Sequence, residues 1–295
     1  MSRGSGRAVL VTGASTGIGR ACALHLASRG HTVFAGVRRA SDGQGLVEEA
    51  RSGLTPVILD VTDPEAIGAA AAALDERVGG GGLSGLVNNA GVAMGGPLEY
   101  LPIDDWRTQL EVNVIGQVAV TKALLPLIRR ARGRVLFIGS VGGRLGTPLM
   151  GPYNASKFAL EGIAEAFREE LRPWNLKVVL IEPGAIKTDI WDKGRAQANR
   201  LEQTLPPEAH ERYGSLFAAV RRLIERQDRM GIGPDRVAKV VERALFVPNP
   251  RARYLVGADA KVIGTFSRLL PDRAKDTVAR RLSGLNVPRL DGGKR

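Results

Sequence analysis

The feature that most constrains how this chain folds is a regular alternation of short apolar segments with longer segments of helical periodicity. The short segments are largely apolar throughout rather than at every second position, which is typical of strands covered on both faces. Strands separated by helices favour right-handed crossovers, and hence a parallel, doubly wound α/β sheet of about seven strands. The segments expected to form strands are 7–13, 31–37, 55–61, 85–91, 134–140, 176–184 and 251–257.

The intervening segments predict helices on both faces of this sheet. Residues 18–30 and 63–78 carry helix start and stop signals, and longer helices are expected over about 103–131 and 152–172. Ligands of such sheets bind at the carboxyl ends of the strands. The residues that directly follow each strand are therefore the candidates for a functional site.

The chain departs from this alternation after residue 190. Residues 190–232 are polar, helical and interrupted by proline, so we interpret about 187–232 as a lid over the site. Residues 259–295 form a C-terminal extension that contains an Arg-rich amphipathic helix. No linker or internal repeat divides the chain, and we expect residues 1–295 to form a single domain.

The composition is that of an ordinary globular protein, with 44% hydrophobic and 24% charged residues. No apolar run approaches the roughly 18 residues of a membrane span, and the start of the chain leaves no room for a signal peptide. Cys22, the single cysteine, excludes an internal disulfide and fits a reducing compartment. We therefore expect a cytoplasmic protein.

The net charge of +12 is spread over the chain. No RNA-binding signature accompanies the basic residues, so we expect no nucleic-acid partner. A peripheral contact of the basic tail with a membrane is the less favoured alternative to packing on the protein itself. The three histidines and one cysteine do not have the spacing of metal ligands, and we expect no metal.

A glycine-rich loop, TGASTGIG (12–19), lies between the first strand and the first helix. Its glycines allow a tight turn and a close approach of the backbone to a phosphate at the helix N-terminus. The spacing G-x-x-x-G-x-G differs from the commoner dinucleotide fingerprint G-x-G-x-x-G.

The same loop also matches G-x-S-x-G, the nucleophile turn of an α/β-hydrolase, with Ser15 as the nucleophile. That alternative requires preceding strands, and here the loop follows the first one. It also requires a downstream histidine, and the one histidine available, His210, lies in a charged helical pattern. We consider a hydrolase unfavoured.

Two arginines follow the second strand, where a reader of the ribose 2′-hydroxyl would be acidic. The residues present are Val37, Arg38 and Arg39. A guanidinium group pairs well with a 2′-phosphate. The cofactor expected is therefore NADP (NADPH) rather than NAD, with Arg38 the favoured contact and solvated loop arginines the alternative.

Tyr153 and Lys157 stand four residues apart, on one face of the helix expected over 152–172. The spacing alone fits many helices. Its setting is more specific, because the pair belongs to an ordered set of motifs. In chain order these are TGASTGIG, Asp60, NNAG (88–91), Asn113, Ser140, Tyr153-x-x-x-Lys157 and Pro183-Gly184. Over residues 7–190 the set resembles the classical short-chain dehydrogenase/reductase family, and the remaining third more loosely resembles its steroid and retinol dehydrogenase-like branch.

The resemblance implies a Rossmann-like fold and an oxidoreductase that interconverts alcohols with ketones or aldehydes. It assigns a catalytic tetrad of Asn113, Ser140, Tyr153 and Lys157. Tyr153 would exchange the proton. Lys157, together with the cationic nicotinamide of the oxidised cofactor, would lower the pKa of the Tyr153 phenol, and it would also hold the nicotinamide ribose. Ser140 would orient the substrate oxygen. Asn113 would hold a water that links Lys157 to solvent.

The resemblance also implies the residues that bind the cofactor. Asp60 would meet the adenine ring, and Thr188 the nicotinamide carboxamide. With Tyr153 and Lys157, the full set is Gly13, Ser15, Thr16, Gly17, Ile18, Gly19, Arg38, Asp60, Val61, Asn89, Ala90, Gly91, Pro183, Gly184, Ile186 and Thr188.

The expected substrate pocket is largely apolar. Its candidate residues are Leu145, Met150, Ile190 and Trp191, with Leu216 and Phe217 on the lid. They favour a lipid-like substrate such as a steroid or retinoid, while Lys187, Lys193 and Arg195 leave an acidic substrate open.

The resemblance further implies a homodimer or homotetramer built on the helices of 103–131 and 152–172. A catalytically silent dinucleotide-binding regulator is the remaining alternative. The intact Ser, Tyr and Lys argue against it.

Overall fold

The structure, a computed structural model, describes residues 7–283. Seven parallel strands form one sheet in the order β3-β2-β1-β4-β5-β6-β7, and this confirms the predicted doubly wound α/β fold. The strands are β1 (Ala8–Val11), β2 (Thr32–Val37), β3 (Leu54–Ile58), β4 (Gly85–Asn88), β5 (Arg134–Ile138), β6 (Lys177–Pro183) and β7 (Arg253–Val256).

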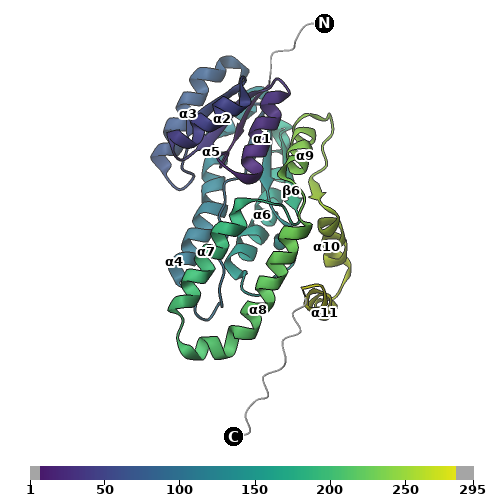
Figure 1. The fold of residues 1–295 in the computed structure, drawn as a ribbon. Coiled ribbons are helices and arrows are strands. Elements are labelled where there is room, and N and C mark those ends of the chain that lie inside the picture. The colour runs from purple at the N-terminus through teal and green to yellow at the C-terminus, as the bar shows by residue number, and fades with distance from the viewer. Residues whose placement is uncertain (1–6, 284–295) are drawn as a thin grey trace.

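Helices cover both faces of the sheet (Figure 1). They are α1 (Gly17–Ser28), α2 (Ala40–Ala50), α3 (Pro64–Val78), α4 (Ile103–Leu110), α5 (Gly116–Ala131), α6 (Gly151–Glu170), α7 (Asp189–Thr204), α8 (Pro207–Met230), α9 (Pro234–Phe246), α10 (Ala258–Leu269) and α11 (Asp272–Ser283). Four short helical turns complete the described chain: η1 (Gly79–Gly81), η2 (Glu111–Ile115), η3 (Val141–Gly143) and η4 (Arg172–Trp174).

The two faces of the sheet form separate hydrophobic cores. Successive strand residues point to opposite faces, so Val9 and Val11 pack with α1, α2 and α9, whereas Leu10 packs with α3, α5 and α6. Both faces are buried, which explains why the strand segments are apolar throughout. The start of α3 follows its sequence signal, because the Asp63 carboxylate accepts the backbone N–H of Glu65 at 2.9 Å.

The helix predicted over 103–131 is interrupted. A π-helical turn, η2, separates α4 from α5 and contains Asn113. The whole run Ile103–Ala131 is long and apolar enough to pass as a membrane span by length and composition. Its residues Val120, Leu124 and Ile128 are nevertheless buried against the sheet, as expected for a core helix.

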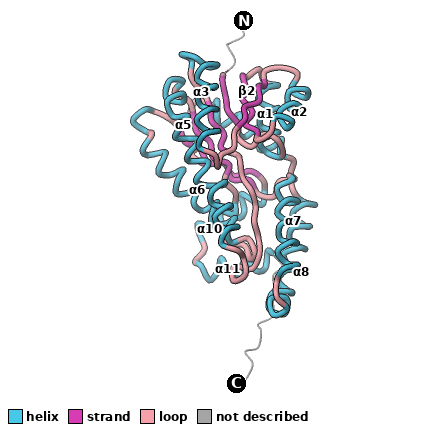
Figure 2. Tube along the Cα trace, turned by 90° about the vertical axis from the view of Figure 1, so that its left-hand side faces the viewer, coloured by secondary structure: helices cyan, strands magenta, loops and turns pink. Residues whose placement is uncertain are grey.

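The segment predicted as a lid consists of α7 and α8. Figures 1 and 2 show both helices extending past the sheet, at the opposite end from α1, α2 and α3. Within the C-terminal extension, α10 and α11 form part of the segment that the structure describes, and residues 284–295 lie outside it.

Candidate active site

The glycine loop between β1 and α1 has a shape that requires small residues. Gly13 and Gly17 have φ angles of +60° and +56°, in the left-handed region that favours glycine. A Cβ atom on Gly13 would lie 2.8 Å from the Cα of Ala90, and one on Gly19 would overlap the Gly13 carbonyl oxygen. The backbone is therefore packed as closely as the sequence predicts.

The N-terminus of α1 opens on a cavity of about 940 Å³. Thr16, the N-cap residue, makes no side-chain hydrogen bond to the amides of the first turn. These amides and the positive end of the helix dipole favour an anion. Ser15, Thr16, Gly17 and Ile18 line the cavity. The residues present thus fit the diphosphate of a dinucleotide.

Asn89 and Thr12 hold the glycine loop in place. Asn89 Nδ2 donates to the carbonyl oxygens of Thr12 and Gly13, at 2.9 Å and 3.1 Å. The Thr12 hydroxyl oxygen accepts the backbone N–H groups of Asn89 and Ala90, at 2.9 Å and 3.0 Å. Asn89, Ala90 and Gly91 line the same cavity, so this segment both supports the loop and borders the dinucleotide site.

Arg38, Asp60 and Val61 line the cavity beyond β2 and β3. Burial raises the pKa of Asp60, but hydrogen bonds from the Thr62 backbone and hydroxyl, together with the charge of Arg38, leave that pKa below its usual value. Arg39 instead pairs with Asp42 at 3.3 Å. Of the two arginines after β2, Arg38 is the one available to a ligand.

Asn113 is buried in the π-helical turn, and both ends of its amide are engaged. Its Oδ1 accepts the Val92 N–H at 2.8 Å, and its Nδ2 donates to the Val92 carbonyl at 3.0 Å and to the Ser156 hydroxyl at 3.1 Å. The side chain thus ties η2 to the segment after β4 and to α6. The role of holding a water for Lys157 remains a prediction.

Ser140 and Tyr153 meet at the carboxyl end of β5. Ser140 caps the short helical turn η3, its Oγ accepting the Gly142 N–H at 3.0 Å. Tyr153 lies in the first turn of α6 and is buried, and its phenol is hydrogen-bonded to the Ser140 hydroxyl. The structure thus brings together the two groups predicted to hold the substrate oxygen.

Lys157 lies one turn after Tyr153 on α6. Its Nζ donates to the Ile138 carbonyl at 2.8 Å and lies 5.7 Å from the centre of the Tyr153 ring. Burial lowers the pKa of Lys157 to about 8.

The pKa of Tyr153 is raised in the protein alone, and the lowering expected from Lys157 together with a bound oxidised cofactor remains a prediction. Burial raises the pKa of the phenol, and the hydrogen bond with Ser140 opposes that rise. The physical reason is that Tyr153 has little exposure to water, while the Lys157 ammonium is itself buried and directed at the Ile138 carbonyl. In the protein alone, Tyr153 is held in its protonated form at neutral pH.

The segment after β6 is fixed by contacts with the C-terminal part of the chain. Ala185 N–H donates to the Asp259 carboxylate at 2.7 Å, and Ile186 pairs with Ile232 in an isolated parallel bridge. Thr188, the N-cap of α7, approaches the glycine loop, since a Cβ on Gly17 would lie 3.2 Å from its Cβ. Pro183 and Gly184 end β6 beside this segment.

Among the predicted substrate residues, Ile190 and Trp191 lie on α7, and Leu145 and Met150 lie on the segment between η3 and α6. Ile190 lines the cavity. Trp191 packs edge-on against Tyr153, with 5.6 Å between ring centres. Met150 directly precedes α6, and the Leu145 carbonyl accepts a hydrogen bond from Asn154 at 3.2 Å.

Several cavity residues were not predicted from the sequence. Arg107 and Glu111 come from α4 and η2, while Gln197 and Arg200 come from α7. Gln197 donates to Asp105 at 2.7 Å and so joins α7 to α4. The only available signal was the helical spacing of Gln197 and Arg200, which a solvated helix face shares.

Comparisons with known proteins agree with this geometry. The family described as short chain dehydrogenase matches residues 7–199. An NADPH-dependent 3-dehydrocapnine reductase of Ornithobacterium rhinotracheale is 36% identical over 277 residues, covering 92% of this chain and 95% of that protein. Human retinol dehydrogenase 5 is 38% identical over 283 residues, covering 92% and 86%.

A solved structure of similar fold is a short chain dehydrogenase/reductase from Burkholderia phymatum in complex with NAD. It is 27% identical, with a TM-score of 0.76, and the match covers 95% of this chain and 97% of that one. The chain belongs to the short-chain dehydrogenase/reductase family and is an NAD(P)-dependent oxidoreductase. This assignment removes the α/β-hydrolase alternative.

Proposed function

We propose that the protein is an NADP(H)-dependent oxidoreductase that interconverts a hydrophobic, lipid-like alcohol with its ketone or aldehyde. The observation that carries the proposal is the contact between Ser140 and Tyr153 at the end of β5, with Lys157 one turn further along α6. The same protein has a cavity of dinucleotide size at its glycine loop. A nicotinamide dinucleotide, when bound, supplies or accepts the hydride.

Tyr153 is the proton donor in the reducing direction. Burial keeps its phenol protonated at neutral pH, so a carbonyl oxygen held by Ser140 receives the proton from Tyr153 as it gains negative charge. In the oxidising direction the same phenol oxygen takes the proton back.

Lys157 and Ser140 act as positioning and binding groups. The Lys157 ammonium, anchored on the Ile138 carbonyl, is placed to hold the ribose hydroxyls of the cofactor. Ser140 fixes the substrate oxygen beside the phenol, which reduces the entropic cost of reaching the reactive geometry.

The preference for NADP rests on Arg38. It follows β2 and lines the cavity, with Val37 where an acidic residue would read a 2′-hydroxyl. Asp60, on the neighbouring strand end, is engaged by Thr62. The NADPH dependence in the name of the Ornithobacterium relative supports the same choice.

The apolar lid supports a lipid-like substrate. Leu149, Leu216 and Ile224 pack around the buried Ala219 and Val220, and Trp191 covers Tyr153. The basic residues that would favour an acidic substrate have other environments, since Arg195 pairs with Asp192 and Lys187 is exposed. The side chain of Lys193 lies outside the described part of the structure.

The test is a screen of the purified protein with NADPH and NADH against long-chain and cyclic ketones and aldehydes. We expect NADPH oxidation with hydrophobic carbonyl compounds, and a loss of kcat of about 10²–10⁴-fold in Tyr153→Phe, because the proton donor is removed. Binding of NADPH to that variant, followed by fluorescence, should be unchanged. Equal turnover by Tyr153→Phe would refute the mechanism.

The cofactor preference is tested by comparing Arg38→Gln with Arg39→Gln. We expect only the first to lose its preference for NADPH, with KM for NADPH raised by about 10-fold or more and KM for NADH little changed. Arg39→Gln is the matched control because its guanidinium pairs with Asp42. Equal use of both cofactors by the parent would remove the role given to Arg38.

We further propose a homodimer that forms through the long helices. Phe158 on α6 is 46% exposed although it is a large apolar residue, and helix α6 together with α5 provides the surface that the family resemblance implies. Light scattering on the parent should give the molar mass of a dimer or tetramer. The Phe158→Asp variant should have a molar mass shifted toward that of the monomer. A monomeric parent would contradict this part of the proposal.

A further inference from the structure

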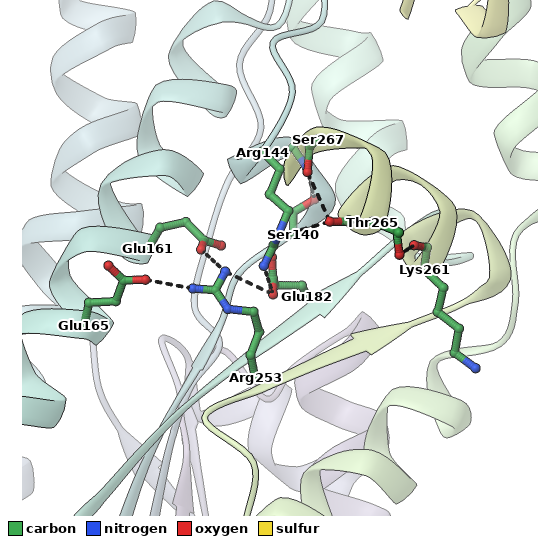
Figure 3. A network of polar contacts seen from close by, with 11 residues as sticks. Ser140, Arg144, Glu161, Glu165, Glu182, Arg253, Lys261, Thr265 and Ser267 are labelled. Atoms are coloured by element: carbon green, nitrogen blue, oxygen red, sulfur yellow. Dashed lines mark hydrogen bonds and ion pairs between the residues drawn. The ribbon is translucent and has the colours of Figure 1, made fainter. Parts of the chain in front are cut away.

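A buried network of carboxylates and guanidinium groups lies behind the active site. Figure 3 shows Arg144, Glu182, Arg253 and Glu161 directed toward one another from four different elements. Arg144 follows η3 and stands four residues after Ser140, and Glu161 lies one turn after Lys157 on α6. The network therefore begins directly beside the catalytic residues and has no part in the proton transfer described above.

The first half of the network joins the Ser140 loop to β6. The Arg144 guanidinium donates hydrogen bonds to both carboxylate oxygens of Glu182. Its Nε donates to Oε1, and its Nη2 donates to Oε2 at 3.0 Å. The Arg144 side chain is 7% exposed and that of Glu182 is fully buried. Glu182 directly precedes Pro183, so this bidentate pair connects the loop after β5 to the carboxyl end of β6.

The second half joins α6 to β7. Arg253 Nη1 pairs with Glu161 and lies 3.5 Å from Glu182 Oε2, while its Nη2 donates to Glu165 at 3.1 Å. One guanidinium is thus shared among three carboxylates. Glu161 Oε1 has no hydrogen-bond partner within the described chain although it is buried.

The Ser140 loop also packs directly on α6 at Glu161. A Cβ on Gly143 would lie 2.7 Å from the Lys157 carbonyl oxygen and 3.4 Å from Glu161 Oε1. Glu161 therefore lies against the segment that carries Ser140, on the same helix as Tyr153 and Lys157.

We propose that Arg144, Glu182, Arg253 and Glu161 form a positioning clamp that holds the Ser140 loop on the Tyr153–Lys157 helix, and that gain or loss of a proton by Glu161 tightens or loosens this clamp. This inference deepens the proposed function and depends on it for what Ser140 and Tyr153 do. Glu161 acts through the loop and does not touch the reacting atoms.

The surroundings of Glu161 give the direction of the effect. Burial, followed by the charge of Glu182, raises the pKa of Glu161 to about 7, and Arg253 acts in the opposite direction. The other charged groups around it are Arg144, already committed to Glu182, and Glu165 on the solvent side of α6; Lys261 on α10 points away (Figure 3). Above neutral pH the ionised Glu161 repels Glu182, and we expect the clamp to loosen.

The experiment follows the loop by hydrogen exchange at pH 6 and pH 8, corrected for the intrinsic exchange rate. In the parent, peptides covering 140–147 should be less protected at pH 8 than at pH 6. Glu161→Gln, which keeps the shape and cannot ionise, should show equal protection at both values. Glu169→Gln is the matched control, because Glu169 is on the same helix and pairs with the exposed Arg172; it should behave like the parent.

The kinetic readout is the pH profile of kcat. The parent should lose activity by roughly 2- to 30-fold across an inflection near pH 7, the range found for coupled positions in proteins, and Glu161→Gln should lack that inflection. KM for NADPH should be the same in both. A purely structural role would lower activity equally at every pH.

The two proposals fail in distinguishable ways. Equal protection of 140–147 at pH 6 and pH 8 in the parent, or the same pH-dependent change in Glu161→Gln as in the parent, overturns the clamp whatever the activity. A pH-dependent loop in a protein that reduces no carbonyl compound would leave the clamp standing and refute the proposed function.

Discussion

The sheet with its glycine loop and the α7–α8 lid are built in different ways. Around the sheet, two large clusters of buried side chains pack between strands and helices on both faces. Among the described residues, the lid carries a small cluster around Ala219 and Val220, which Leu149 from the segment before α6 joins. The lid is joined to the body by polar contacts, Gln197 with Asp105 and both Arg212 and Tyr213 with Glu99, and by the packing of Trp191 on Tyr153.

The difference indicates where specificity can change at little cost. Dense packing leaves little tolerance for a change in volume, so the dinucleotide half is constrained at nearly every position. Exposed polar contacts contribute little to stability, so the lid can vary its apolar lining without endangering the fold. Proteins that share this chemistry would then differ mainly in the lid.

The largest effect on stability is expected in the glycine loop. Gly19→Ala places a Cβ against the Gly13 carbonyl and the Asn89 amide, and we expect it to destabilise the protein by about 2–3 kcal/mol and to weaken NADPH binding. Gly45→Ala is the control, because a Cβ there meets nothing within 4 Å; in helix α2 it should stabilise by roughly 0.5–1 kcal/mol. Urea unfolding measures both. Similar free energies of unfolding for Gly19→Ala and Gly45→Ala would contradict the difference expected between a packed and an open position.

A smaller change in the free energy of unfolding, opposite in sign to that of Gly19→Ala, is expected when Lys157 is replaced. Its pKa of about 8 in the folded protein lies below the 10.5 of the unfolded chain, so burying the ammonium costs about 3 kcal/mol at pH 7. Lys157→Met removes that cost but leaves the Ile138 carbonyl without its donor, which offsets roughly 1–2 kcal/mol. The variant should be inactive yet more stable than the parent by about 1–2 kcal/mol at pH 7.

The pH dependence checks the origin of that gain. Because the folded protein releases the Lys157 proton at a lower pH than the unfolded chain, its contribution to the free energy of unfolding rises with pH between about 8 and 10.5. The advantage of Lys157→Met in urea unfolding should therefore shrink as the pH rises from 8 to 10.5. A constant difference would show that the gain has another cause.

The smallest effect on stability is expected in the lid. Glu99→Ala removes the partner of Arg212 and Tyr213, and we expect a loss below about 1 kcal/mol because the contacts are exposed. The lid should nevertheless open more readily and raise KM for the substrate several-fold, with kcat less affected. Glu169→Ala, which breaks an equally exposed pair with Arg172, should leave KM unchanged. A large drop in stability for Glu99→Ala would mean that the lid is part of the core.

Much of the fold could be predicted because local patterns determine it. All seven strands were predicted, with ends displaced by a few residues, since apolar segments such as 134–140 have no other place than a buried sheet. The glycine loop, Asn89 and the Ser140–Tyr153 contact followed from ordered motifs whose physical roles are local.

The remaining features depend on contacts that a linear pattern does not contain. Arg253 pairs with Glu161, which lies 92 positions away in the sequence. No local sequence pattern around either residue predicts this pairing. Gln197 and Arg200 face the cavity from a helix whose polar residues resemble a solvated face. The raised pKa of Tyr153 depends on burial, which the spacing of Tyr153 and Lys157 does not report.

The π-helical turn at Glu111–Ile115 also bears on how insertions and deletions could change this helix during evolution. A π turn holds one residue more than an α-helical turn, as if a single insertion had been absorbed without breaking the helix. A deletion of Val112 would let α4 and α5 join as one regular helix, but each residue of an α-helix turns about 100°. Asn113 and Arg107 would then face in different directions relative to each other. Lineages that lost the extra residue would be expected to have lost, or rebuilt, the contact between this helix and the catalytic helix.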